Sequence, residues 1–171
     1  MEIVWFFGSS CAGKQTLIEA IIANPKAFAH TFDFSGAQVH ALKEASIWIS
    51  RKNHDQRPNL ISAIKDLTDQ HSDKTILVKG QSVDLAKGLL QQLQADVPNV
   101  KQSIVFVYTD PAETLERWKT HRDWYKPSMT VQSVVDEVNY QVKFIRALAN
   151  IPTKFVDGGK GKKYAEINSL L

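Results

Sequence analysis

The feature that most constrains the fold is the stretch GSSCAGKQT, residues 8–16, which follows the apolar run IVWFF without a gap. The apolar run predicts a short buried strand, and the recurrence of Leu17, Ile18, Ile21 and Ile22 predicts a helix directly after the loop. A glycine-bracketed loop between a strand and a helix can wrap its N–H groups around an anion, and the helix amino terminus adds positive potential. The stretch therefore predicts a phosphate-binding loop.

The spacing of this loop is the Walker A, or P-loop, pattern G-x-x-x-x-G-K. In such a loop the backbone cradles the phosphates and the lysine, here Lys14, reaches the outer phosphates as a point charge. The next position usually supplies a hydroxyl to magnesium, but here it is Gln15, which offers an amide oxygen on a longer arm. The expected nucleotide-binding residues are Gly8, Ser9, Ser10, Cys11, Ala12, Gly13, Lys14, Gln15 and Thr16.

Apolar runs and helical periodicities alternate along the rest of the chain. The predicted strands are residues 3–7, 28–34, 75–78, 103–108 and 153–156. The predicted helices are residues 14–24, 39–50, 60–67, 83–93, a segment beginning at Pro111, one beginning near residue 128, and 164–171. Strands that alternate with helices imply crossover connections and a parallel sheet covered on both faces. We therefore predict an α/β three-layer sandwich with a five-stranded parallel sheet, in a single domain over residues 1–171.

Composition narrows the functional classes. The chain has 171 residues and a formal net charge of +3, too small to indicate nucleic-acid binding by itself. Cys11 is the only cysteine, which excludes an intramolecular disulfide and suits a reducing compartment. The amino terminus does not read as a signal peptide, and no window approaches the length of a membrane span. We expect a cytoplasmic protein that does not contact a membrane.

Three stretches resemble the P-loop kinase superfamily, in particular the adenylate-kinase-like nucleoside monophosphate kinases. GKQT, residues 13–16, resembles the GKGT of that family, and VFVYTDPAETLERW resembles its fourth strand and following helix. The resemblance implies an ATP-dependent phosphotransferase with a short lid around residues 117–128, where Arg117 and Arg122 would clamp the transferring phosphoryl group. FVDGG resembles the fifth strand and its turn, which implies that Asp157 and Gly158 lie against the nucleotide base.

The acceptor side carries fewer signals. Asp33 follows a predicted strand at the edge where open α/β sheets bind ligands, so we expect it to orient an attacking hydroxyl or to hold magnesium. Arg51 and Arg57 are candidate contacts for an acceptor phosphate. Thr16 and Asp33 are the expected magnesium ligands, and ATP and Mg²⁺ are the expected cofactors.

One departure from the family pattern is marked. Many such kinases end the third strand with an acidic residue that organises magnesium, whereas here the strand reads ILVKGQ. Lys79 thus stands where the aspartate would be and cannot ligate the ion. Lys79 and Gln81 are instead candidate contacts for substrate.

Three functions remain open on the sequence. The first is a kinase acting on a nucleoside, a nucleotide or another small acceptor. The second, motivated by Gln15 and Lys79, is a nucleotide-binding module with little or no turnover. The third is a kinase of nucleic-acid ends, suggested by the basic loops at residues 51–57 and 160–163. The oligomeric state and the base preference are left open.

Overall fold

The computed structural model describes residues 2–28, 31–32, 39–42, 61–62, 64–66, 69, 75–80 and 83–168. Within these residues, five parallel strands form one sheet in the order β2-β3-β1-β4-β5. The strands are β1 (Glu2–Phe7), β2 (Val39–Leu42), β3 (Thr75–Lys79), β4 (Lys101–Tyr108) and β5 (Thr153–Asp157). The predicted α/β fold with a parallel sheet is confirmed.

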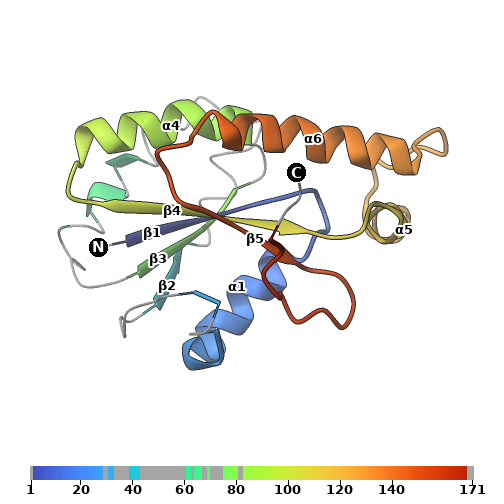
Figure 1. The fold of residues 1–171 in the computed structure, drawn as a ribbon, viewed down its shortest axis with the longest axis horizontal. Coiled ribbons are helices and arrows are strands. Elements are labelled where there is room, and N and C mark those ends of the chain that lie inside the picture. The colour runs from blue at the N-terminus through green and yellow to red at the C-terminus, as the bar shows by residue number, and fades with distance from the viewer. Residues whose placement is uncertain are drawn as a thin grey trace.

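Helices cover both faces of this sheet (Figure 1). They are α1 (Lys14–Ala23), α4 (Val83–Asp96), α5 (Pro111–His121) and α6 (Val131–Arg146), with a 3₁₀ helix, η1, at Pro25–Phe28. The helices α4 and α6 lie along one face and α1 lies on the other, while α5 follows the carboxyl end of β4 and contacts α6. The arrangement is the predicted three-layer sandwich.

Alternate residues of β1 fill the two halves of the core. Ile3, Trp5 and Phe7 pack with the buried residues of α4 and α6, whereas Val4 and Phe6 pack with those of α1. This two-sided burial explains why the strand reads as an unbroken apolar run rather than as an alternating one.

Helix starts follow the local chemistry that the sequence indicates. The Asp110 carboxylate accepts hydrogen bonds from the backbone N–H groups of Ala112 and Glu113, and Pro111 begins α5. The helix α6 begins with a capping box between Thr130 and Ser133. None of the helices in the described ranges is long and apolar enough to cross a bilayer.

Three predicted elements are wrong in the parts that the structure describes. The predicted second strand at residues 28–34 is not one in its described part: Phe28 ends η1, and Thr31 and Phe32 form a turn whose N–H groups both bond to the Phe28 carbonyl. The strand that pairs with β3 is instead Val39–Leu42, at the start of the predicted helix 39–50. Pairing with the edge of β3 stabilises residues 39–42 as a strand more than their weak helical periodicity favours a helix.

Residues 164–168, the described part of the predicted helix 164–171, are also not helical. Lys163 and Tyr164 have φ angles of 52° and 55°, which no helix accommodates. The backbone beyond them pairs with the edge of β5, since the N–H of Asp157 donates to the Ala165 carbonyl and the N–H of Ile167 donates to the Phe155 carbonyl. This segment therefore covers a strand edge that would otherwise be exposed.

Candidate functional site

The loop between β1 and α1 has the backbone of an anion cradle. Gly8 and Gly13 have φ angles of 134° and 96°, and Cys11 between them has a φ of 62°. Gly13 occupies the N-cap of α1 and no side chain caps the helix. The first-turn N–H groups are therefore available to a ligand, which is the arrangement that binds phosphate at a helix amino terminus.

Lys14 is held at the mouth of this loop. Its Nζ donates to the carbonyl oxygens of Gly8 at 2.6 Å and Ser9 at 2.7 Å, and the residue is 8% exposed. Burial, with smaller contributions from the positive charges of Lys79 and Arg122, lowers the pKa of the ammonium from its usual 10.5 to about 8, even though the Glu137 carboxylate acts to raise it. Lys14 thus lies close to other cations, and a bound anion would neutralise their combined positive charge.

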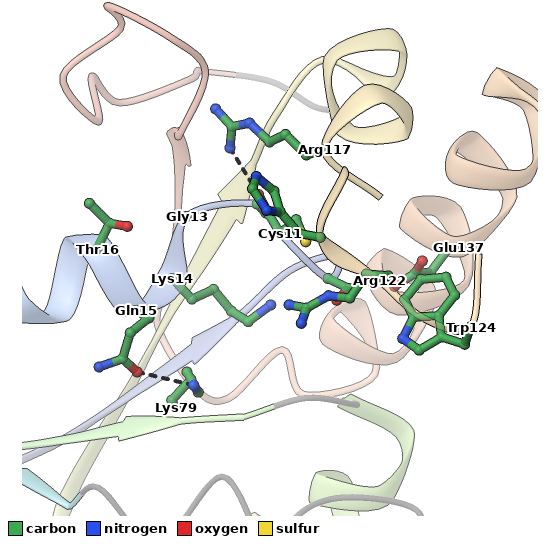
Figure 2. A pocket seen from close by; sticks show the side chains of 13 residues that line it. Cys11, Gly13, Lys14, Gln15, Thr16, Lys79, Arg117, Arg122, Trp124 and Glu137 are labelled. Carbon is green, nitrogen blue, oxygen red and sulfur yellow. Dashed lines mark hydrogen bonds between the residues drawn. The ribbon is translucent and has the colours of Figure 1, made fainter. Parts of the chain in front are cut away.

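Gln15 and Lys79 contact one another beside Lys14 (Figure 2). The Lys79 Nζ donates to the Gln15 Oε1 at 3.0 Å, while the Gln15 Nε2 donates to the Glu19 Oε1 at 2.7 Å. Lys79 is at the end of β3, where its backbone pairs in register with Phe6, two residues before Gly8. Two departures from the usual P-loop pattern therefore form a single interaction.

Side chains of α5 and of its C-cap residue, Arg122, bind the loop. The Trp118 Nε1 donates to the Ser10 carbonyl at 2.8 Å, the Arg122 Nε donates to the Ser10 Oγ at 2.9 Å, and the Arg117 Nη1 donates to the Cys11 carbonyl at 2.9 Å. The predicted lid segment thus supplies two donors to the loop backbone, from Arg117 and Trp118, and one donor to the Ser10 side chain, from Arg122. Arg122 also points toward Lys14 in Figure 2.

Arg117 joins two loops that are far apart in the sequence. Besides the Cys11 carbonyl, it donates to the Gly158 carbonyl at 3.2 Å and to the Glu113 carboxylate. Nearby, the Thr109 hydroxyl donates to the Ala12 carbonyl at 3.1 Å. The predicted phosphate contact of Arg117 stays a prediction, because in this structure its donors serve the loop carbonyls and Glu113.

We expect Arg117→Leu to lower the free energy of unfolding by about 2 kcal/mol, because the change removes charge-assisted hydrogen bonds to two partly buried carbonyls and leaves Glu113 without its cation. Denaturant unfolding of the ligand-free protein measures this. Arg146→Leu, the same change on an exposed residue at the end of α6, should shift stability by no more than about 0.5 kcal/mol. Equal effects of the two changes would contradict the role of Arg117 as a clamp.

The loop borders a cavity of about 600 Å³, within the usual range for small-molecule sites. Its other walls come from Lys79 and from α5, α6 and the segment between them. The contributors are Arg117, His121, Arg122, Trp124 and Glu137. The structure therefore places Lys14, Gln15, Lys79, Arg117 and Arg122 around one cavity, and their predicted roles toward a ligand stay predictions.

Glu137 is the cavity residue that sequence reasoning did not find. Of the described residues that line the cavity it alone carries a carboxylate, and the Gln141 Nε2 donates to its Oε1 at 3.0 Å. Trp124, 44% exposed, lies beside it in Figure 2 and meets the ring of buried Trp118 edge-on at 5.1 Å between centroids. The only signal for Glu137 in the sequence is its place on an amphipathic helix, which does not distinguish a site residue from a solvated one.

Thr16 and the turn after β5 meet on the other side of the loop. The Tyr164 hydroxyl donates to the Gly13 carbonyl at 3.2 Å and is hydrogen-bonded to the Thr16 side chain, and burial raises the pKa of Tyr164 above its usual value. The Asp157 Oδ1 accepts from the Gly159 N–H, and Gly158 packs against Ala12. Asp157 and Gly158 are therefore adjacent to the phosphate loop, while their predicted contact with a base stays a prediction.

The predicted magnesium ligation by Thr16 and Asp33 stays a prediction. No group of three or more His, Cys, Asp or Glu residues converges among the described residues, and the amide oxygen of Gln15 accepts from Lys79. The Thr16 side chain points away from Lys14 in Figure 2. Four predicted residues lie outside the described part of the chain, namely Asp33, Arg51, Arg57 and Gln81.

No protein-family model and no curated protein matches this sequence. Several solved structures do resemble the fold. A sugar kinase from Janibacter sp. HTCC2649 superposes with a TM-score of 0.52 at 16% identity, covering 92% of this chain and 86% of the other. A protein from Chloroflexus aurantiacus, provisionally described as a kinase, gives a TM-score of 0.54 at 16% identity and covers 93% and 89%.

A third match is a structure from the PezAT toxin–antitoxin system of Streptococcus pneumoniae, with a TM-score of 0.52, 14% identity, and coverage of 96% and 70%. At these identities the likeness establishes the fold and leaves the activity open. The architecture, the strand order and the loop together give the conclusion: this chain has the α/β fold of the P-loop kinases.

Proposed function

We propose that the protein is a phosphotransferase that moves the γ-phosphoryl group of ATP to an oxygen of a small acceptor. The single observation that carries the proposal is the convergence of an uncapped helix amino terminus and the cations Lys14, Lys79 and Arg122 on one cavity. Such a cavity suits a polyphosphate, whose charge both the N–H groups and the cations neutralise.

In the proposed reaction an acceptor oxygen forms a bond to the γ-phosphorus while the bond to the bridging oxygen breaks, and ADP leaves. The proton of an acceptor hydroxyl passes to a carboxylate. Asp33 is the predicted base, and Glu137 is the carboxylate that the described wall of the cavity supplies. We also propose that residues 117–128 act as the lid of a single domain, because closure over the cavity would keep water from the transferring group.

The test is to incubate the protein with ATP and a panel of nucleosides, nucleoside monophosphates and sugars, and to measure ADP formation against a reaction without acceptor. Acceptor-dependent ADP and a phosphorylated product support the proposal. ATP binding without turnover on any acceptor would favour the second candidate function, a nucleotide-binding module, which the replacement of both usual magnesium positions by Gln15 and Lys79 supports.

We expect Glu137→Gln to raise the KM for the acceptor about tenfold while the KM for ATP changes less than twofold. The carboxylate lies at the α6 wall, beyond Lys14 and Arg122, where a second substrate would meet the phosphates. The neighbouring Asp136→Asn is a matched control, because Asp136 is exposed and accepts from Gln132 on the same helix. Steady-state kinetics decides the point, and parallel changes in both KM values would place Glu137 on the nucleotide side.

A further inference from the structure

Two positions that supply magnesium chemistry in other P-loop sites carry an amide and an ammonium here. The position after the P-loop lysine usually gives a hydroxyl to the ion, and an aspartate of the Walker B strand usually holds it as well. In this chain they are Gln15 and Lys79, and the two side chains are hydrogen-bonded at 3.0 Å. Because the two replacing side chains contact each other, they indicate one altered interaction rather than two independent losses of magnesium ligands.

The geometry fixes Lys79 beside the phosphate loop. Its strand pairs with β1 through Phe6, and the N–H of Gly80 donates to the Phe6 carbonyl at 2.9 Å. The Gln15 Nε2 is engaged by Glu19, so the amide oxygen faces the Lys79 ammonium. The ammonium is therefore oriented within the same cavity that Lys14 enters (Figure 2).

Charge balance argues in the same direction. Lys14, Lys79 and Arg122 are close enough for Lys79 and Arg122 to disfavour the charged form of Lys14. The Glu137 carboxylate offsets part of this repulsion. A metal-free triphosphate, with about four negative charges, would relieve the rest more strongly than its magnesium complex, which carries about two. To coordinate the ion, the Gln15 Oε1 would also have to lose the hydrogen bond that it accepts from Lys79.

We propose that this site binds nucleoside triphosphate as the metal-free anion, with the Lys79 ammonium, oriented by Gln15, supplying the positive charge that magnesium supplies in other P-loop sites. The inference rests on the proposed nucleotide-binding function and specifies its cofactor requirement. It assigns Lys79 a direct contact with the phosphates, beyond the general substrate contact expected from the sequence.

The first test is calorimetry of the full chain with ATP in excess EDTA and, separately, in excess magnesium chloride. We expect ATP to bind in EDTA at least as tightly as in magnesium. Binding that is tenfold or more tighter in magnesium would overturn the inference while leaving the proposed function standing. Absence of binding in both conditions would overturn the proposed function and the inference with it.

Variants of Lys79 separate its charge from its packing. We expect Lys79→Met to weaken ATP binding in EDTA at least tenfold and Lys79→Arg, which keeps the charge, to weaken it less. As a control we use Lys101→Met, because Lys101 is exposed at the start of β4, at the opposite end of the parallel sheet, and β1 separates that strand from β3; this change should leave binding unchanged. Equal affinities of Lys79→Met and Lys101→Met, with both proteins folded by circular dichroism, would overturn the inference.

The double variant Gln15→Ser/Lys79→Asp restores the usual hydroxyl and carboxylate. We expect it to bind ATP at least tenfold more tightly in magnesium than in EDTA, the reverse of the wild-type preference. If the double variant binds ATP in EDTA as the wild type does, the ammonium is not the group that replaces the ion. Competition with ADP and with inorganic triphosphate in EDTA tests whether the phosphates, rather than the base, carry the effect.

Discussion

Gly8→Ala is expected to lower the free energy of unfolding by about 4 kcal/mol, a large fraction of the total for a domain of this size. Two costs combine at this position. The φ of 134° is a conformation that L side chains rarely adopt, and a Cβ would lie 2.1 Å from the Val107 carbonyl oxygen. Because that oxygen belongs to the backbone of β4, which pairs with a strand on each side, it cannot move aside as the end of a side chain can.

Gly161→Ala separates the two costs. Gly161 also has a positive φ, 78°, but a Cβ there meets nothing within 4 Å. The expected loss is about 1 kcal/mol, from backbone strain alone. Urea unfolding of both variants and the wild type measures the difference, and similar losses for the two glycines would show that the contact with Val107 is not restrictive.

The sequence predicts the core of this fold because its strongest patterns are set by burial. An apolar run such as residues 3–7 fits only a strand covered on both faces, and the Asp110-Pro111 start of α5 rests on local chemistry. The second strand is different. Val39–Leu42 pairs with β3 through a tertiary contact that no local pattern encodes, while Phe32 is buried in a turn and its ring contacts that of the partly buried Phe28. Local periodicity cannot distinguish these outcomes.

In the site, too, local features could be predicted from the sequence and tertiary contacts could not. The loop at residues 8–16 is predictable because one short segment provides the glycines, the lysine and the helix start. Gln15 and Lys79 are 64 residues apart in the sequence, where they are two separate departures from the usual pattern. Only the fold shows that their side chains form one interaction. Glu137 enters the cavity because α6 lies along one face of the sheet and contacts α5, a fact about packing that the composition of α6 does not contain.

Lys14→Met is expected to weaken ATP binding at least about 100-fold, because the change removes a cation from a water-poor loop where charge-assisted hydrogen bonds are strong. The ligand-free variant should have a stability close to that of the wild type, because the lost hydrogen bonds to the Gly8 and Ser9 carbonyls are offset by removal of a buried charge. Burial lowers the Lys14 pKa to about 8, so below that pH the folded protein carries the unfavourable cost of a buried charge. This cost is lost as the pH rises from about 8 toward the usual value of 10.5, and it is absent in the variant.

The same pKa gives the binding reaction a pH dependence with a definite sign. Above pH 8 the free protein holds Lys14 largely neutral, whereas a bound triphosphate favours the ammonium form, so binding takes up a proton and weakens as the pH rises from 7 to 9. Calorimetry at pH 8.5 in two buffers of different ionisation enthalpy measures the uptake directly. Lys14→Met should show a smaller uptake than the wild type, because the methionine side chain cannot bind a proton. Wild-type proton uptake no larger than that of Lys14→Met would mean that Lys14 does not contact the phosphates, since no other change in the variant removes a titrating group.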